Sequence, residues 1–193
     1  MIVPETRPRL SSAKLHELIA PFGIDRQKYP LVVVGIRGYY KDTMGKPGVN
    51  DRGIYDDAIF IDSPCVTAAY NGNTDPSRYR PGYGTGPQKG MASLKPGCYY
   101  AHQFGMHKGQ YLALVQTAGP VVVIRDGDPP YEDKGFFGIN IHRGGMQGTS
   151  SEGCQTIYPP QWESFIALAI DQAQRFYGTT WRTHIIPYVL LEG

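Results

Sequence analysis

The sequence has few cysteines, little net charge and no long apolar run. Its three cysteines cannot all pair within one chain, and their spacing fits neither a disulfide framework nor a zinc ribbon, so at least one thiol should stay free. The formal net charge of +2, without a basic cluster, gives no support for nucleic-acid binding. No apolar stretch approaches the length of a membrane span.

The N-terminal segment also lacks a targeting signal. Residues 1–8 (Met-Ile-Val-Pro-Glu-Thr-Arg-Pro) have neither the charged nor the apolar region of a secretory leader, so we expect synthesis in the cytoplasm as a soluble protein. A length of 193 residues suits one domain with a sizeable core, and we treat 1–193 as a single domain.

The composition predicts a mostly-β (α+β) fold. Glycine (24), proline (16) and tyrosine (14) are abundant, and helix-favouring runs are few. One short helix is expected over 11–20, with Ser11 as its cap, and one long helix over 159–178, with prolines in its first turn and Gly178 at its end. Apolar or alternating runs predict strands at 31–36, 57–61, 66–70, 93–100, 110–116, 119–126, 137–141 and 183–191.

Two regions between these elements are open to more than one interpretation. The Gly-, Pro- and Tyr-rich segment 71–90 is either a substrate-covering loop or an ordered surface excursion. His102 and His107 fall in a predicted connection between strands, and without a third ligand they do not make a metal site. A pocket-wall or hydrogen-bonding role fits one of them better, and we assign His107 to substrate binding.

The chemically most informative stretch is 136–158, which places His142 and Cys154 at the two ends of a glycine-rich connection. A strand over 137–141 would deliver His142, and the glycines would let the backbone turn back toward Cys154. A thiol is mostly protonated at neutral pH and becomes a nucleophile when an imidazole takes its proton. We interpret the pair as base and nucleophile; the alternative is a buried cysteine and a strand-end histidine with no chemical role.

Residues around the pair suggest the rest of an acyl-transfer site. The backbone N–H groups of Gly153 and Cys154, in a tight turn, would hold an oxyanion. Arg143, beside the base, would bind a substrate carboxylate or keep the thiolate ionised. No cofactor and no metal is expected.

Residues 141–144 (Ile-His-Arg-Gly) and 149–154 (Thr-Ser-Ser-Glu-Gly-Cys) together resemble the catalytic signature of L,D-transpeptidases, the YkuD-like domains. In that family a strand-borne His-Gly is followed by Ser-His-Gly-Cys. Upstream, 94–99 (Leu-Lys-Pro-Gly-Cys-Tyr) is similar to the family's Thr-Pro-x-Gly-x-Phe/Tyr element, and it contains Tyr99, a further candidate for substrate binding. The resemblance covers about residues 90–158 and implies an L,D-transpeptidase-like β-sandwich.

By position, the resemblance implies that Cys154 is the nucleophile, His142 the base and Ser151 the motif serine. Glu152 stands where the family has a second histidine, and the interval from histidine to cysteine is short. A compressed interval of this kind resembles divergent members from bacteriophages and antibacterial secreted effectors, which cut or cap wall peptides.

The resemblance implies a peptidoglycan stem peptide as substrate, with no nucleic-acid partner and no membrane span. Cys154 would attack the L-centre carbonyl of an L,D bond and form a thioester. Resolution of the thioester by water gives carboxypeptidase or endopeptidase activity. Resolution by an amine gives transpeptidation or exchange. The wall would be reached by lysis or non-classical export, with a delivery or immunity partner. Two alternatives are a non-catalytic wall-binding or phage structural module, with the tyrosine-rich region 71–100 as its surface, and an intracellular cysteine peptidase.

Overall fold

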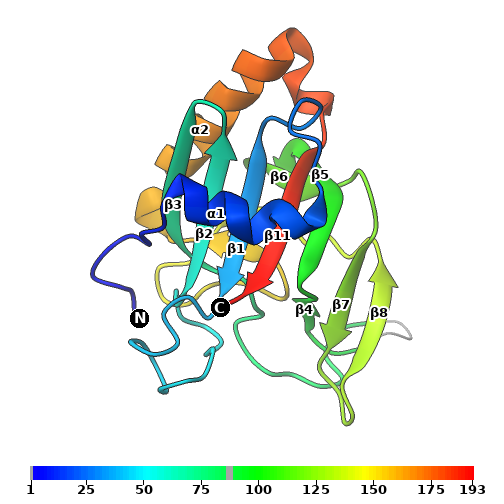
Figure 1. Cartoon of the computed structure of the whole chain (residues 1–193). Coiled ribbons are helices and arrows are strands. Elements are labelled where there is room, and N and C mark those ends of the chain that lie inside the picture. Colours follow the sequence, from blue (N-terminus) through cyan, green and yellow to red (C-terminus); the bar gives the residue numbers. More distant parts are fainter. Residues whose placement is uncertain (1, 86–88) are drawn as a thin grey trace.

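The computed structural model describes residues 2–85 and 89–193, and most of its strands close into a barrel (Figure 1). The barrel strands are β1 (Val32–Arg37), β2 (Asp57–Ser63), β3 (Val66–Asn73), β5 (Gly97–His107), β6 (Tyr111–Gln116), β9 (Ile141–Arg143), β10 (Gln155–Ile157) and β11 (Ile186–Glu192). Their order around the barrel is β1-β11-β5-β6-β9-β10-β3-β2. A separate antiparallel sheet contains β4 (Ala92–Leu94), β7 (Val121–Arg125) and β8 (Tyr131–Gly135), with β7 in the middle.

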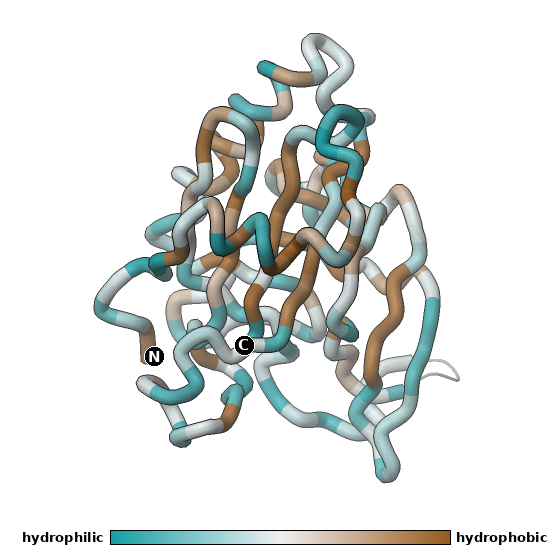
Figure 2. The backbone as a smooth tube through the Cα atoms, viewed as in Figure 1, coloured by the Kyte–Doolittle hydropathy of each residue, from teal (hydrophilic) through white to brown (hydrophobic). Residues whose placement is uncertain are grey.

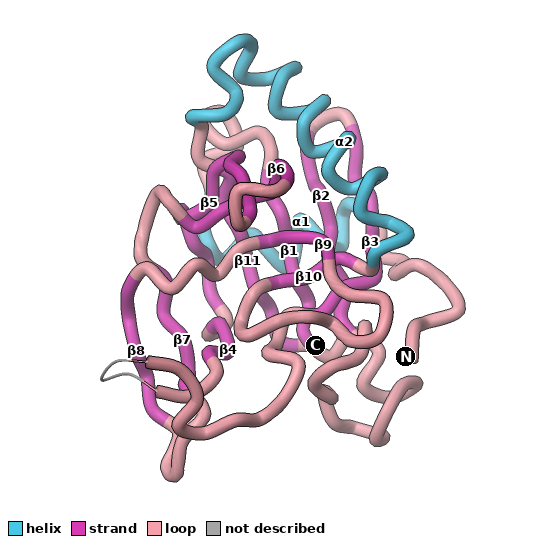
Figure 3. The backbone as a smooth tube through the Cα atoms, turned by 180° about the vertical axis from the view of Figure 1, so that it is seen from behind, coloured by secondary structure: helices cyan, strands magenta, loops and turns pink. Residues whose placement is uncertain are grey.

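Two α-helices cover the barrel on different sides (Figures 1 and 3). The short helix α1 (Ser12–Ile19) begins where the Ser11 hydroxyl accepts a hydrogen bond from the Lys14 N–H at 3.1 Å. The long helix α2 (Pro159–Tyr177) ends at Gly178, and short 3-10 turns, η1 (Ala20–Phe22) and η2 (Gly178–Thr183), follow the two helices. The mostly-β content and both predicted helices are therefore confirmed. The expected two-sheet sandwich is not, because the strands close into a barrel with a small sheet beside it.

The continuous apolar sequence of β1 results from packing on both of its faces. Val33 lies in the larger apolar cluster, together with Trp162 and Phe165 of α2. Val32 and Val34 lie in a second cluster with residues of α1. Because successive strand residues point to opposite faces, a strand covered on both sides needs no polar alternation. Figure 2 shows this concentration of apolar residues in the central strands. In the part of the chain that the structure describes, no helix has the length and apolar character needed to cross a membrane.

Two local expectations about the strands need revision. His102 and His107 were predicted in a connection, but both belong to β5. The prediction was wrong because β5 tolerates a buried polar side chain: the His102 ring bonds the Ile139 carbonyl oxygen through Nε2 at 2.8 Å. The predicted strand 137–141 is also shorter than expected, since only its last residue enters β9.

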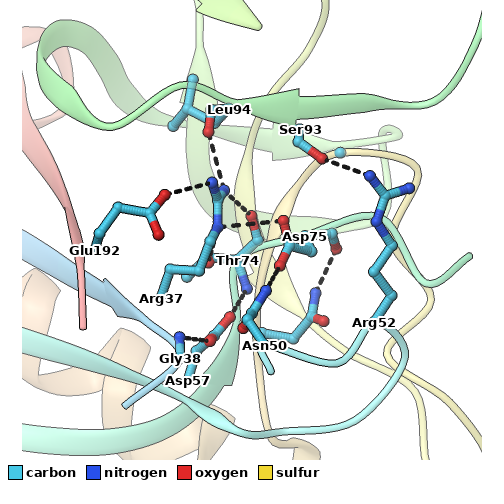
Figure 4. Close-up of polar contacts among 12 residues, drawn as sticks. Arg37, Gly38, Asn50, Arg52, Asp57, Thr74, Asp75, Ser93, Leu94 and Glu192 are labelled. Atoms are coloured by element: carbon cyan, nitrogen blue, oxygen red, sulfur yellow. Dashed lines mark hydrogen bonds and ion pairs between the residues drawn. The ribbon is translucent and has the colours of Figure 1, made fainter. Parts of the chain in front are cut away.

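A buried polar cluster fastens the ends of β1, β2 and β3 to the small sheet (Figure 4). The Asp57 carboxylate accepts two backbone N–H hydrogen bonds, from Gly38 and Thr74, each at 2.5 Å. The Arg37 guanidinium donates to the carbonyl oxygens of Thr74 and Leu94, each at 2.9 Å. The cluster therefore ties the ends of these three strands to β4 of the small sheet.

Replacing Asp57 by asparagine should destabilise the protein. An amide has one acceptor oxygen, so its NH2 group would face one of the two backbone N–H donors and leave that donor unsatisfied. We expect Asp57→Asn to lower the free energy of unfolding by about 1–3 kcal/mol, measured by urea denaturation. Asp42→Asn, at an exposed position, is the matched control. An unchanged denaturation midpoint for Asp57→Asn would contradict the role assigned to this carboxylate.

Candidate active site

A cleft with a volume of about 640 Å³ lies where the small sheet meets the barrel. Its walls come from the 77–85 segment, the start of β4, the β5–β6 turn, residues 137–142 and the turn before β10. Most of the predicted site residues line this cleft: Cys154, His142, Ser151, Gly153 and His107. Arg143 and Tyr99 are not part of its lining.

The parallel pairing of β9 with β10 places the histidine and the cysteine on neighbouring segments that line one cleft (Figure 3). In this register His142 is opposite Thr156, and the Gln155 N–H donates to the Asn140 carbonyl oxygen at 2.8 Å. Cys154 therefore lies beside Asn140, whose N–H donates to the Cys154 sulfur at 3.4 Å. The thiol itself donates to the Gly138 carbonyl oxygen at 3.2 Å.

The His142 imidazole is held with one nitrogen free. Its Nδ1 lies 2.7 Å from the Arg143 carbonyl oxygen. A carbonyl oxygen only accepts, so Nδ1 carries the proton and Nε2 keeps its lone pair. Burial, followed by the nearby charge of His107, lowers the pKa of His142 to about 4. His142 is therefore a neutral base at physiological pH.

His107 has the opposite tautomer and stacks on His142. The two ring centroids are 4.1 Å apart, with 19° between the ring planes. The Asn140 side-chain oxygen accepts the Gln116 N–H at 2.8 Å, so the Asn140 amide nitrogen must be the atom that donates to His107 Nδ1 at 3.1 Å. His107 Nδ1 is then the acceptor, and its proton is on Nε2. The cleft thus contains one imidazole poised to accept a proton and a second that offers an N–H.

The resting thiol is protonated. Burial raises the pKa of Cys154 to about 11, although the Asn140 N–H and the positive charge of Lys108 act in the opposite direction. From the sequence, Arg143 was expected to keep this thiol ionised or to bind a carboxylate. Instead, the Arg143 guanidinium lies over the Tyr111 ring, 5.2 Å from its centroid, outside the cleft lining.

Ser151 organises the turn that presents Cys154. Its hydroxyl donates to the Cys154 carbonyl oxygen at 2.7 Å and accepts the Gly153 N–H at 3.0 Å. The Gly153 N–H is thus already used, and of the two predicted oxyanion donors only the Cys154 N–H has no hydrogen-bond partner among the described residues. Glycine is required at 153 because φ is +151° and a Cβ would lie 2.3 Å from the Ala92 carbonyl oxygen.

The 77–85 segment packs along this turn. The Ser77 N–H donates to the Ser151 carbonyl oxygen, and the Ser151 N–H donates to the Ser77 hydroxyl, each at 2.8 Å. Further along, the Tyr83 hydroxyl donates to the Glu152 carboxylate at 2.6 Å. Part of the 71–90 segment therefore lines the cleft, while residues 71–73 belong to β3 and residues 86–88 lie outside the described residues. That the segment covers a substrate stays a prediction.

Gln116 and Asn140 are site residues that sequence reasoning missed. The Gln116 side-chain oxygen accepts the N–H groups of Phe137 and Ile139, at 3.0 and 2.9 Å. One side chain thus takes the place of a strand partner for the segment that leads to His142. For Asn140, the sequence did contain a signal, since this polar residue interrupts the apolar run 137–141.

Tyr99 has a structural position. Its hydroxyl donates to the carbonyl oxygens of Lys95 and Val122, at 2.6 and 3.3 Å, and so links β5 to the small sheet. The expectation that Tyr99 contacts substrate is not supported by this placement, because its hydroxyl is bound to carbonyl oxygens outside the cleft lining.

Comparisons with protein-family models, with curated proteins and with solved structures found no match. Among the described residues, no group of three or more histidine, cysteine or acidic side chains is arranged to hold a metal ion. Functional inference therefore depends on the geometry of the cleft.

The protonation state of Cys154 can be measured by alkylation. In a Cys65→Ser/Cys98→Ser background, the rate of reaction of Cys154 with iodoacetamide should rise tenfold per pH unit through neutrality, because the thiolate fraction rises toward a pKa of about 11. The control protein retains Cys65, which is exposed, as its single cysteine. A rate plateau for Cys154 at neutral pH would instead show a preformed thiolate–imidazolium pair.

Proposed function

We propose that this protein is an L,D-transpeptidase-like cysteine enzyme that acts on peptidoglycan stem peptides at L,D bonds. The observation that carries the proposal is the β9–β10 pairing, which places a thiol and a neutral imidazole with a free Nε2 in one cleft. The order of histidine and cysteine along the chain, and the serine three residues before the cysteine, fit the same family.

The proposed reaction begins with attack of the Cys154 sulfur on the L-centre carbonyl carbon. The thiol proton passes to His142 Nε2 as the S–C bond forms, because both groups are neutral at rest and a free thiolate is unfavourable in this buried position. The Cys154 N–H is the donor placed to stabilise the oxyanion. The tetrahedral intermediate then collapses, the C–N bond breaks, and the leaving amine takes the proton from His142.

The resulting thioester is resolved by water or by an amine. His142 removes a proton from the incoming nucleophile, and Cys154 leaves with that proton as a thiol. Water gives net hydrolysis, and an amine gives transfer of the acyl group. Both routes conserve the protonation states found at rest.

His107 supplies the second imidazole of the proposed site. The residue next to Gly153, where the resembling family has a histidine, is Glu152, and its carboxylate is engaged by Tyr83. His107 reaches the cleft from β5 instead and stacks on the base. This arrangement supports acyl chemistry at Cys154 without a histidine at 152.

Purified muropeptides provide the direct test. We expect wild-type protein to release a terminal D-amino acid from stem peptides or to cut an L,D cross-link, detected by mass spectrometry. Cys154→Ala should abolish the reaction, and His142→Ala should slow it by about 100- to 10,000-fold, the usual contribution of a general base. Cys65→Ala, which changes an exposed cysteine outside the cleft, should retain full activity.

The alternative functions give different results in the same assay. Unchanged muropeptides with retention of the protein on sacculi would indicate a binding module. Cleavage of protein substrates without any effect on muropeptides would indicate a cysteine peptidase. Activity that survives Cys154→Ala would remove the proposed nucleophile.

A further inference from the structure

The cleft is lined by more positive than negative side chains. Four basic residues line it, Arg78, Arg80, Lys108 and Arg125, against a single carboxylate, Glu152. The protein as a whole has a net charge of only +2, so this excess is local to the cleft. A cleft of this kind favours an anionic group on the substrate.

Three of the four cations have no acidic partner in the described part of the chain. Arg125 is paired with Asp133 at 2.7 Å, whereas no ion pair forms at Lys108, Arg78 or Arg80 within the described residues. The residues outside the described part, Met1 and 86–88 (Gly-Pro-Gln), include no acidic side chain. Lys108 and Arg78 are thus available to a ligand, whereas the Arg80 guanidinium lies over the Tyr83 ring, 4.2 Å from its centroid.

Lys108 is the most unusual of the three because its backbone is strained. It follows His107 directly, in the tight turn between β5 and β6, and its φ is +50°. A side chain other than glycine, asparagine or aspartate is uncommon there, since Cβ approaches the backbone. The Gln110 N–H closes the turn by donating to the His107 carbonyl oxygen at 3.0 Å. A lysine in a turn that suits glycine or asparagine suggests that its ammonium is needed at this place.

The Lys108 ammonium acts on the reacting groups. Against the dominant effect of burial, its charge lowers the pKa of Cys154. It also adds to the lowering of the pKa of His107 and of His142, after burial in each case. Lys108 lines the same cleft as Cys154 and directly follows His107, whose ring stacks on His142. A cation in this position suits a charged group only one residue from the scissile bond, a span of about 3.5 Å in an extended chain.

We propose that Lys108 binds the free α-carboxylate of the residue on the leaving side of the scissile bond, and so selects peptides that carry this carboxylate. The inference rests on the proposed function and names its substrate class: stem peptides whose D-residue is a free acid and not an amide. Lys108 thereby takes the carboxylate-binding role that the sequence suggested for Arg143, whose guanidinium lies over Tyr111 instead. Arg78, which lines the same cleft, is placed to meet a further carboxylate of the same peptide.

The test compares two substrates that differ only in this group, a stem peptide ending in D-alanine and the same peptide ending in D-alanine amide. For wild type, kcat/KM should be about 10- to 100-fold higher for the acid, the usual effect of a charge-assisted hydrogen bond. Lys108→Asn should bring kcat/KM for the acid down toward that for the amide, mainly through KM, so that the acid-to-amide ratio falls by the same factor. Lys108→Arg should keep the preference, and Lys134→Asn, on an exposed part of β8 outside the cleft, should change neither substrate.

A loss of activity in Lys108→Asn would not be explained by misfolding, because asparagine tolerates a positive φ. The melting temperature of this variant should be unchanged or higher than that of wild type. A wild-type enzyme that processes acid and amide equally would overturn the inference and leave the proposed function intact. An equal loss for both substrates in Lys108→Asn would also overturn it, since it would show an effect on Cys154 instead of recognition. Failure of wild type to process either peptide would overturn the proposed function and this inference with it.

Discussion

The candidate site depends on one constraint, the parallel pairing of β9 with β10. Parallel strands need a crossover, and here it is the glycine-containing segment 144–154 that ends at the nucleophile. The pairing places Asn140 beside Cys154, and both His142 and the thiol face the same cleft. Ser151 and Ser77 fix the turn on one side, and Gln116 fixes the approach to β9 on the other.

Burial determines the chemistry that such a site supports. An ionised pair in this environment would lose hydration, so the structure favours a neutral thiol and a neutral imidazole. Proton transfer must then accompany bond formation, and charge appears only when substrate is present. The stacked His107 reinforces this state, because two protonated rings 4.1 Å apart would repel each other.

Much of this arrangement was predictable from local sequence, and the rest depends on tertiary contacts. Ser11 and Gly178 mark helix ends by backbone chemistry alone, and the apolar run of β1 indicates burial on both faces. The presence of His142 and Cys154 in one cleft agrees with the expectation from the glycines between them, and their pairing as base and nucleophile stays a prediction. The role of Gln116 was not predictable, since it comes from a distant strand and replaces backbone partners with a side chain. The directions of Arg143 and Tyr99 likewise depend on neighbours that are remote in sequence.

The protonation state of His142, read from side-chain nitrogen NMR shifts across a pH titration, tests most directly whether this histidine is a neutral base at rest. Comparison with His142→Gln assigns the resonance. We expect a neutral ring with its proton on Nδ1 from neutral pH down to about pH 4, where it gains a second proton. A charged His142 at pH 7, or a proton on Nε2, would contradict the proposal that this histidine is the resting base for Cys154.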